Sequence, residues 1–381
     1  MKEKLFSIID SLYDEYVKVW EDVCNIESPT VFKEGVDKVG KYFADLAVKK
    51  GFKVDIKPFE KAGNVVCITA NENAKCQPIS FSGHLDTVHP VGSFGTPAVK
   101  IEGDKIFGPG VTDCKGGIVL AFMVIDALIK AGYNKRPLML LLQADEEHNM
   151  SDKGCITHIA NVAKDSLAFF NLECSLAYGT ATIERKGIVT YVFTIEGVEA
   201  HASKCAIEGA SAILEASHKI IELEKLKDND GITCNCGVIK GGSVSNTVPG
   251  SCEFKVDFRY STKEELDKIK EFCENLAKKE YVKGCVTTAK ISGFRIAMVK
   301  SDKNYNLLDN VNKILKSNDM QTLKPIKTGG ASDAADITDF GIPCLDGFGV
   351  IGGRIHSPEE FACLESLKIC GKKLAVIASE L

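Results

Sequence analysis

The chain has 381 residues, of which 47 are Lys or Arg and 52 are Asp or Glu, so its formal net charge is -5. Hydrophobic residues make up 45% and charged residues 26%, a globular balance that excludes a disordered, collagen-like or coiled-coil chain. Since the chain has neither a basic excess nor a run of about 20 apolar residues, we expect no nucleic-acid or membrane partner.

The cysteines indicate a reducing compartment. The chain has 15 of them, scattered through apolar segments, and it contains no CxxC motif. In a chain of this length we expect most of them to be small buried hydrophobic residues rather than disulfide partners. Acidic side chains interrupt the apolar pattern of the N-terminal segment, which favours a helix over a secretory signal peptide. We therefore predict a cytoplasmic protein.

The first part of the chain alternates helical and strand patterns. Apolar residues at three- and four-residue spacing predict helices, and short β-rich or continuous apolar runs predict strands. Apolar strands separated by helices are typical of a mainly parallel sheet with helices on both faces, so we expect an α/β domain. The expected helices are residues 3–22, 32–51 and 116–131, and the expected strands are residues 64–70, 78–82, 137–143 and 167–172.

The pattern changes near residue 184 and changes back near residue 296. The intervening elements follow the order β-α-β-β-α-β, which is typical of a ferredoxin-like α+β domain. We therefore predict one α/β domain formed by residues 1–183 and 296–381, interrupted by an inserted domain of residues 184–295. The last helix is expected over residues 359–380. The expected elements of the inserted domain are strands 189–195, 231–240, 252–260 and 285–293 and helices 209–226 and 263–279.

The first candidate site residues are His84 and Asp86, in the segment SFSGHLDTVHP after the strand at residues 78–82. At strand spacing, side chains two residues apart point the same way. This arrangement suits an imidazole that binds a metal through one nitrogen while a carboxylate holds the other nitrogen. His89, in the same segment, is a candidate pocket residue.

Asp113 lies in the glycine-dense segment GPGVTDCKGG, directly before the expected helix 116–131. Glycine-rich loops at helix N-termini can bind phosphate, which is the alternative interpretation. The glycine spacing matches neither of the phosphate-binding motifs, and an acid at the centre of the loop would repel a phosphate. A metal ligand is the better interpretation of Asp113.

Further acidic residues follow two of the expected strands. The strand 137–143 runs directly into Ala144, Asp145, Glu146 and Glu147, and the strand 167–172 is followed by Glu173. Ligands of α/β sheets bind at the carboxyl ends of the strands. Because consecutive side chains diverge, one glutamate of the pair can bind a metal while the other faces the reacting atoms.

The remaining candidate is His356, in the glycine-rich segment GVIGGRIHSPEE. Together the candidate ligands are two imidazoles and three carboxylates, a set suited to zinc, cobalt or manganese. Two divalent ions and one hydroxide would neutralise three carboxylates, whereas a single ion would leave a buried negative cluster. We therefore predict two metal ions, most simply zinc, held by His84, Asp113, Glu147, Glu173 and His356.

The motifs resemble those of a known family. GHLDTV, GPGVTDCKGG, ADEE, NLE, GVEAHA, GGSVSNTVPG and GGRIHSPEE occur in this order along nearly the whole chain. They are similar to the segments of the di-zinc metallopeptidase family of bacterial glutamate carboxypeptidase. Aminoacylase, acetylornithine deacetylase and succinyl-diaminopimelate desuccinylase belong to the same superfamily.

The resemblance implies a role for each site residue. Asp113 would bridge the two ions, with His84 and Glu173 on one ion and Glu147 and His356 on the other. Asp86 would orient His84, and Glu146 would be the general base.

The resemblance also implies that the inserted domain is a lid and dimerisation domain. His201 would then stabilise the oxyanion in the active site of the neighbouring subunit of a homodimer. Arg259 would bind a substrate carboxylate bidentately, and the other implied substrate contacts are Asn246, Gly330 and Ser332.

Two positions depart from the usual pattern of the family. Cys114 stands where methionine is frequent, and Ala206 stands where proline is common after the lid histidine. We expect neither residue to touch a metal ligand, so both bear on loop conformation and substrate preference rather than on the chemistry.

The sequence therefore predicts a metal-dependent enzyme that hydrolyses an amide bond of a peptide or an N-acyl amino acid, as a carboxypeptidase or deacylase. One alternative is an aminopeptidase that acts on di- or tripeptides, although such relatives more often carry aspartate at the position of Glu173. The other alternative is a non-catalytic, metal-stabilised binding protein, for which the base Glu146 would be superfluous.

Overall fold

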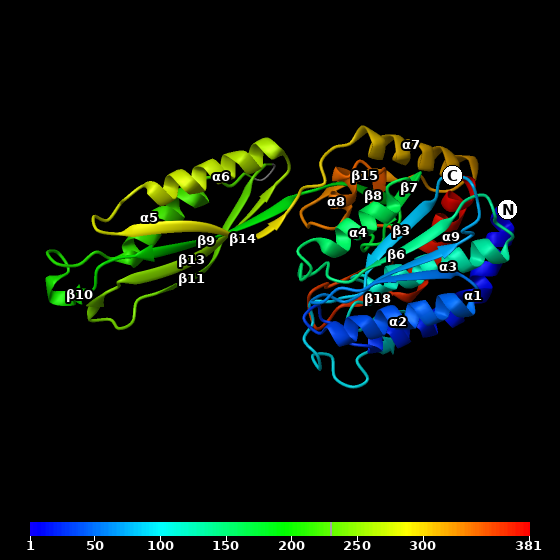
Figure 1. Cartoon of the computed structure of the whole chain (residues 1–381), viewed down its shortest axis with the longest axis horizontal. Coiled ribbons are helices and arrows are strands. Elements are labelled where there is room, and N and C mark those ends of the chain that lie inside the picture. The colour runs from blue at the N-terminus through cyan, green and yellow to red at the C-terminus, as the bar shows by residue number, and fades with distance from the viewer. Residues whose placement is uncertain (229–230) are drawn as a thin grey trace. The chain divides into compact units, whose positions relative to one another are not determined.

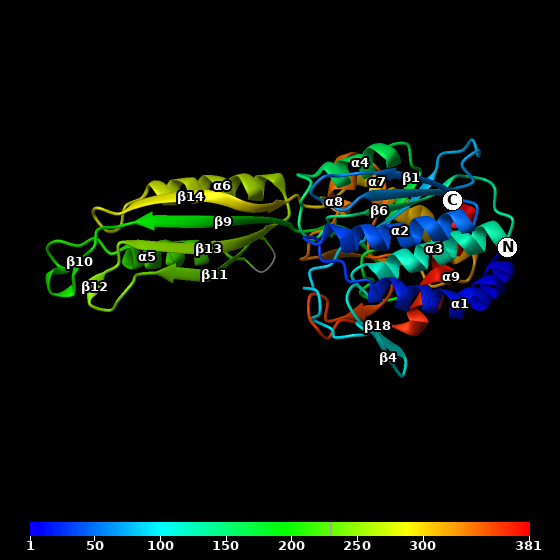
Figure 2. The ribbon, with the colours of Figure 1, turned by 60° about the horizontal axis from the view of Figure 1, so that its bottom comes forward.

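A computed structural model of the chain describes residues 1–228 and 231–381, and its internal contacts divide these into two units. The first unit consists of Met1–Ile183, Lys300–Ile326 and Ser332–Leu381. The second consists of Glu184–Val299 and Lys327–Ala331. Figures 1 and 2 show the elements of each unit.

The first unit is built on a six-stranded sheet with the strand order β1-β2-β6-β3-β7-β16. The strands β6, β3, β7 and β16 run parallel, which confirms the mainly parallel sheet predicted from apolar strands separated by helices. β16 was not among the predicted strands. β2 pairs antiparallel with both β1 and β6, so it runs opposite to the other strands of this sheet. The patterns predicted neither this reversal nor the strand β1. The strands are β1 (Lys53–Lys57), β2 (Val65–Ala70), β3 (Ile79–His84), β6 (Leu138–Gln143), β7 (Ala168–Asn171) and β16 (Cys344–Leu345).

Helices cover both faces of this sheet (Figures 1 and 2). On one face, Phe122 of α3 packs against Tyr16 of α1 and stacks on Phe43 of α2. α9 packs against α1 and α3, and on the other face α4 packs against α8 and β6. The helices are α1 (Lys2–Asn25), α2 (Lys33–Lys49), α3 (Lys115–Lys130), α4 (Gly154–Ala163), α7 (Asp302–Ser317), α8 (Ala334–Asp339) and α9 (Leu364–Glu380).

A second, smaller sheet in this unit has the order β17-β18-β5-β4. Its strands are β4 (Lys100–Glu102), β5 (Lys105–Phe107), β17 (Gly352–Gly353) and β18 (Phe361–Cys363). The expected start of the last helix at residue 359 is wrong, because Phe361 pairs with Phe107 in this sheet and the helix begins at Leu364. β8 (Thr180–Arg185) and β15 (Lys324–Thr328) form a separate two-stranded ladder.

The second unit has the expected ferredoxin-like fold. Its sheet has the order β11-β13-β9-β14 and is antiparallel throughout. Apolar residues at alternate positions of β9 and β13 are buried, and Phe193 stacks on Phe254 with ring centroids 4.8 Å apart. Its elements are β9 (Gly187–Glu196), β10 (Ala200–His201), α5 (Ala212–Glu224), β11 (Thr233–Gly241), β12 (Thr247–Val248), β13 (Ser251–Tyr260), α6 (Lys263–Lys278) and β14 (Val286–Arg295).

The predicted fold class is confirmed: an α/β sheet with helices on both faces and an α+β unit inserted into its chain. Among the described residues, no helix combines the length and the apolar character that a membrane-spanning segment requires.

Candidate metal centre

The centre lies at the carboxyl ends of three neighbouring parallel strands. His84 is the last residue of β3, and it is in register with Gln143, the last residue of β6. Glu147 follows β6 by four residues, and Glu173 follows β7 by two. Since parallel strands end at the same edge of a sheet, three separate segments deliver their polar side chains to one place.

Asp113 connects the two histidines of the cluster. Its Oδ1 lies 3.0 Å from Nε2 of His84, and its Oδ2 lies 3.2 Å from Nε2 of His356. Asp113 is only 7% exposed, because it stands in the loop that leads into the buried helix α3. Each of its two carboxylate oxygens therefore faces a different imidazole.

A second carboxylate lies beside each imidazole. Glu173 Oε1 is 3.7 Å from Nε2 of His84, and Glu147 Oε2 is 3.3 Å from Nε2 of His356. The five predicted ligands thus come together as two pairs, each consisting of one imidazole and one carboxylate, with Asp113 between them. Their roles as ligands remain a proposal.

Asp86 supports the cluster from a fully buried position. Its carboxylate accepts hydrogen bonds from the backbone N–H groups of Glu146 and Glu147 and from the Thr30 hydroxyl. Nδ1 of His84 lies 3.4 Å from Asp86 Oδ1 and closer, at 2.9 Å, to the Asp86 backbone oxygen. Asp86 is therefore placed to hold both the ring of His84 and the loop that carries the glutamate pair.

The expectation that Cys114 touches no predicted ligand is wrong. The backbone N–H of His84 lies 2.9 Å from the Cys114 sulfur, and the thiol is completely buried. Burial raises the pKa of this thiol to about 12, so it remains protonated near neutral pH. The sulfur therefore packs beneath the strand end that positions His84.

The protein charges of the cluster shift the pKa values of its members in opposite directions. Hydrogen bonds to Asp113 and Glu147 raise the pKa of His356 to about 10. Burial lowers the pKa of His84, but the hydrogen bonds to Asp113 and Asp86 outweigh it, and the net pKa lies well above its usual range. The two imidazoles hold the pKa of Asp113 far below its usual range against the opposing effect of burial. Without metal, the imidazoles are thus the cations that compensate the carboxylates.

The donor set fits divalent metal ions. Single donor atoms of His84, Asp113 and Glu147 lie within 4.8 Å of one another, and so do those of His84, Cys114 and Glu173. Imidazole nitrogens and carboxylate oxygens are the donors that zinc, cobalt and manganese accept. A cation at each pair would replace the protons that the imidazoles carry in its absence.

The predicted base, Glu146, is 8% exposed and adjacent in sequence to Glu147. Ser332 belongs to the first unit, where its buried hydroxyl donates a hydrogen bond to Asp346 Oδ2 at 2.7 Å. Its side chain therefore already has a structural partner.

Four predicted residues lie in the second unit, namely His201, Asn246, Arg259 and Gly330. His201 is exposed, and its Nδ1 lies 2.8 Å from the Ser203 hydroxyl. Arg259 pairs with Asp257, with 2.8 Å between Nε and Oδ1. The backbone oxygens of Asn246 and Gly330 accept hydrogen bonds from Ala202 N–H and Arg185 respectively.

Sequence reasoning assigned no role to Glu360, which is completely buried next to the cluster. Its carboxylate accepts a hydrogen bond from the backbone N–H of Asp113 and lies 2.9 Å from Nε2 of His89. His89 is itself buried, so it supports this carboxylate instead of lining an open pocket. The available signal was the pair Glu359–Glu360 close after His356, but sequence alone does not tell which of the two is buried.

A separate group in the second unit also combines metal-binding side chains: Glu224, Cys234 and Cys236. Both oxygens of Glu224 have partners, since one accepts from Cys236 N–H and the other pairs with Lys227. The neighbouring Cys236 thiol, followed by burial, raises the pKa of the Cys234 thiol. We therefore interpret this group as a hydrogen-bonded pair of cysteines beside a carboxylate whose oxygens already have partners.

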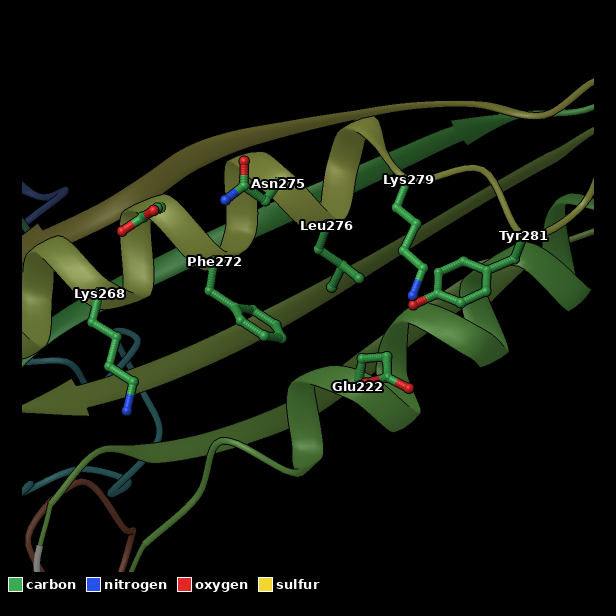
Figure 3. A pocket seen from close by; sticks show the side chains of 8 residues that line it. Glu222, Lys268, Phe272, Asn275, Leu276, Lys279 and Tyr281 are labelled. Atoms are coloured by element: carbon green, nitrogen blue, oxygen red, sulfur yellow. The ribbon is translucent and has the colours of Figure 1, made fainter.

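A groove of about 340 Å³ lies between α5 and α6. Figure 3 shows the side chains that line it. None of the predicted site residues lines it. Its walls combine charged, aromatic and other side chains of α5, α6 and the segment after α6: Glu222, Lys268, Glu271, Phe272, Asn275, Leu276, Lys279 and Tyr281.

Comparison with known proteins supports the resemblance predicted from the motifs. Residues 183–285 match the family described as "Peptidase dimerisation domain". The chain is 26% identical over 350 residues to carboxypeptidase G2 of Pseudomonas sp. (strain RS-16), covering 90% of this chain and 83% of that protein. It is 26% identical over 341 residues to succinyl-diaminopimelate desuccinylase of Helicobacter pylori (strain HPAG1), covering 82% of each.

The fold is also shared with solved structures. A tripeptidase of Staphylococcus aureus superposes with a TM-score of 0.80 at 19% identity, covering 97% of this chain and 98% of that chain. At this identity the likeness concerns the fold alone.

Proposed function

We propose that this chain is a hydrolase of the metallopeptidase and deacylase family that its motifs resemble, and that it cleaves an amide bond of a peptide or an N-acyl amino acid. The observation that carries the proposal is Asp113, whose two carboxylate oxygens face His84 and His356 separately. Such an arrangement suits two adjacent cations better than one.

The proposed cofactors are two divalent ions, most simply zinc. His84 and Glu173 would hold one, Glu147 and His356 the other, and Asp113 would bridge them. When bound, such ions lower the pKa of a water toward ~7 and polarise the scissile carbonyl.

Glu146 is the proposed general base. The backbone N–H groups of Glu146 and Glu147 both donate hydrogen bonds to the Asp86 carboxylate. These bonds fix the backbone from which the two side chains extend. Because consecutive side chains diverge, Glu147 can face the metal pair while Glu146 faces the reacting atoms. Glu146 would accept a proton from the attacking water and donate it to the leaving amine.

The second unit is the proposed dimerisation and lid domain. β11 is an edge strand, and Val238 and Ile239 on it are about half exposed, at 47% and 52%. Ile213 and Ile221 of the adjoining helix α5 are also exposed. An apolar edge strand is a surface that proteins usually pair or cover. A homodimer formed through this surface would allow His201 of each subunit to complete the active site of the other.

Arg259 is the proposed group that recognises a substrate carboxylate. It is already paired with Asp257, so binding would require the guanidinium to exchange one carboxylate for another. Until a substrate binds, Asp257 neutralises the charge of Arg259. The planar guanidinium can then form a bidentate contact with the substrate carboxylate. Asn246, Gly330 and Ser332 remain proposed as its helpers.

A carboxypeptidase or deacylase is favoured over an aminopeptidase because Glu173, rather than aspartate, stands beside His84. The similarity to carboxypeptidase G2 and to the desuccinylase supports this choice, whereas the likeness to the tripeptidase concerns the fold. The 15 cysteines, all free thiols, are compatible with the reducing cytoplasm in which we place the enzyme.

A turnover screen tests the proposal. The metal-stripped protein is loaded with zinc or cobalt and offered C-terminally free dipeptides, N-acyl amino acids and tripeptides blocked at the C-terminus. We expect hydrolysis of substrates with a free carboxylate. Hydrolysis confined to substrates with a free amino terminus would favour the aminopeptidase, and metal binding without any turnover would favour the binding protein.

A further inference from the structure

The loop that carries Asp113 is held by one carboxylate from a distant part of the chain. Oε1 of Glu360 accepts hydrogen bonds from the backbone N–H groups of Thr112 and Asp113, at 2.8 and 3.0 Å. Oε2 accepts from Gly110 N–H at 3.2 Å and lies 2.9 Å from Nε2 of His89. Both oxygens are thus occupied, and the residue is inaccessible to solvent.

The conformation of the loop is arranged around this carboxylate. Gly110 has a φ of +77°, in the left-handed region that favours glycine, and this lets the loop turn three N–H groups toward the same side chain. The Thr112 hydroxyl adds a bond to the backbone oxygen of Phe361, at 2.6 Å. The backbone of Asp113 therefore has little freedom as long as Glu360 is in place.

Glu360 also stands close to the other half of the metal cluster. It lies four residues after His356, in the segment between β17 and β18. One side chain thereby ties the loop of Asp113 to the segment that carries His356, while Asp113 itself faces both imidazoles. A shift of Glu360 would change the distances on both sides of the proposed bridge.

We propose that Glu360, supported by His89, is a positioning residue that fixes the bridging carboxylate of Asp113 between the two metal sites. The inference rests on the proposed function, because it takes Asp113 to be a metal ligand. Groups that orient metal ligands commonly contribute 10–100-fold, as an order of magnitude, to metal affinity or activity.

The neighbouring glutamate provides a matched control. Glu359 is 68% exposed, and among the ion pairs of the described residues it pairs only with Arg354, which is 60% exposed. Glu359→Gln and Glu360→Gln remove the same charge from adjacent positions. Glu360→Gln keeps the volume of the side chain but replaces one carboxylate oxygen with an NH₂ group, which cannot accept a hydrogen bond. At least one of the backbone N–H groups of Gly110, Thr112 and Asp113 then loses its acceptor.

The experiment measures zinc binding to the metal-stripped full-length protein by competition with a chromophoric chelator. In parallel, denaturant unfolding gives the stability of the same metal-free variants. We expect Glu360→Gln to bind zinc roughly 10–100-fold more weakly, with kcat reduced and KM changed little, and Glu359→Gln to match the wild type. His89→Leu should give the same direction of change with a smaller loss, because the carboxylate remains.

A purely structural role would lower the stability of metal-free Glu360→Gln but leave the zinc affinity of the folded protein unchanged, and that result would overturn the inference. If Glu360→Gln does not fold, His89→Leu decides: weaker zinc binding supports the inference and unchanged binding overturns it. Absence of zinc binding by the wild-type protein would instead refute the proposed function.

Discussion

Asp113 shows how much of the proposed chemistry depends on single side chains in fixed places. Its oxygens lie 3.0 and 3.2 Å from two imidazoles that belong to segments 272 residues apart in sequence. Buried acceptors of this kind require compensating charge. In the metal-free protein the imidazoles supply that charge, and the second prediction below rests on it.

The first prediction separates the base from the ligands. Glu146→Gln should retain both metals, because Gln is nearly isosteric and Glu146 is not a proposed ligand. Turnover should fall by about 10²–10⁴-fold, the usual cost of losing a general base. Metal analysis and kcat are measured on the same preparation, with Glu147→Gln as the variant that should lose metal. Parallel loss of metal and activity in Glu146→Gln would reverse the two assignments.

The second prediction concerns the pH dependence of the metal-free protein. Hydrogen bonds to Asp113 and Glu147 raise the pKa of His356 from 6.5 to about 10 in the folded state. A raised pKa contributes stability that is fully present below 6.5 and is lost as the pH rises through about 10. His84, whose pKa is also raised, acts in the same direction.

Thermal unfolding of the metal-stripped protein should therefore show a falling Tm between pH 6.5 and 10. His356→Gln should make this fall shallower, since one of the two contributing groups is gone. Zinc affinity should rise over the same interval, because the metal displaces protons. A Tm that rises with pH in the wild-type apoprotein would contradict the assignment of the cations.

At the scale of elements, the second unit contains a buried ion pair that fastens a helix to a loop. Lys219 and Glu215, one turn apart on α5, lie 3.0 Å apart, and their side chains are 0% and 1% exposed. Lys219 donates to the backbone oxygens of Leu276 and Lys279, and Glu215 accepts from the N–H groups of Tyr281 and Val282. The pair thus ties α5 to the end of α6 and the turn before β14.

The third prediction follows from this pair. Lys219→Met should lower the free energy of unfolding by about 3–5 kcal/mol, because it leaves the Glu215 carboxylate buried without its cation. Denaturant unfolding measures the loss. Lys225→Met is the matched control, since Lys225 is 63% exposed and pairs with Glu222 at the surface, and it should show no measurable change. A loss in Lys219→Met no larger than that in Lys225→Met would show that the buried Glu215 carboxylate does not depend on its cation.

At the scale of the whole molecule, the proposed dimer distributes each active site over two chains. His201 is exposed on the short strand β10 of the second unit, and its ring contacts Ser203 of the same loop. The five proposed metal ligands belong to the first unit. A role for His201 in the neighbouring subunit is therefore testable by mixing.

The fourth prediction is that two inactive variants restore activity when they exchange subunits. A mixed dimer of His201→Ala and Glu146→Gln has one site with an intact Glu146 and an intact His201 from its partner. Turnover should return to about a quarter of the wild-type value, because half of the exchanged dimers are mixed and each has one complete site. Labelled subunits confirm the exchange. Exchange without any recovery would refute the role of His201 in the neighbouring subunit.

The sequence by itself determined the fold class, most of the elements and the set of residues that cluster. Periodicity depends on which faces are buried, so the strand that ends near Glu147 was recognisable from its continuous apolar run. The strand before His84 was recognisable from a short β-rich run. The carboxyl ends of parallel strands meet at one edge of a sheet. This general rule, together with the family motifs, is sufficient to predict that His84, Glu147 and Glu173 lie close together.

Only the tertiary structure decided which groups support that cluster. Glu359 and Glu360 are equivalent in sequence, but one is exposed and the other is buried beneath the loop of Asp113. The contacts of Cys114 with His84 and of His89 with Glu360 likewise join segments that no local pattern relates. Hydrogen bonds across 30 to 271 residues depend on how the segments pack, and packing is a property of the whole fold.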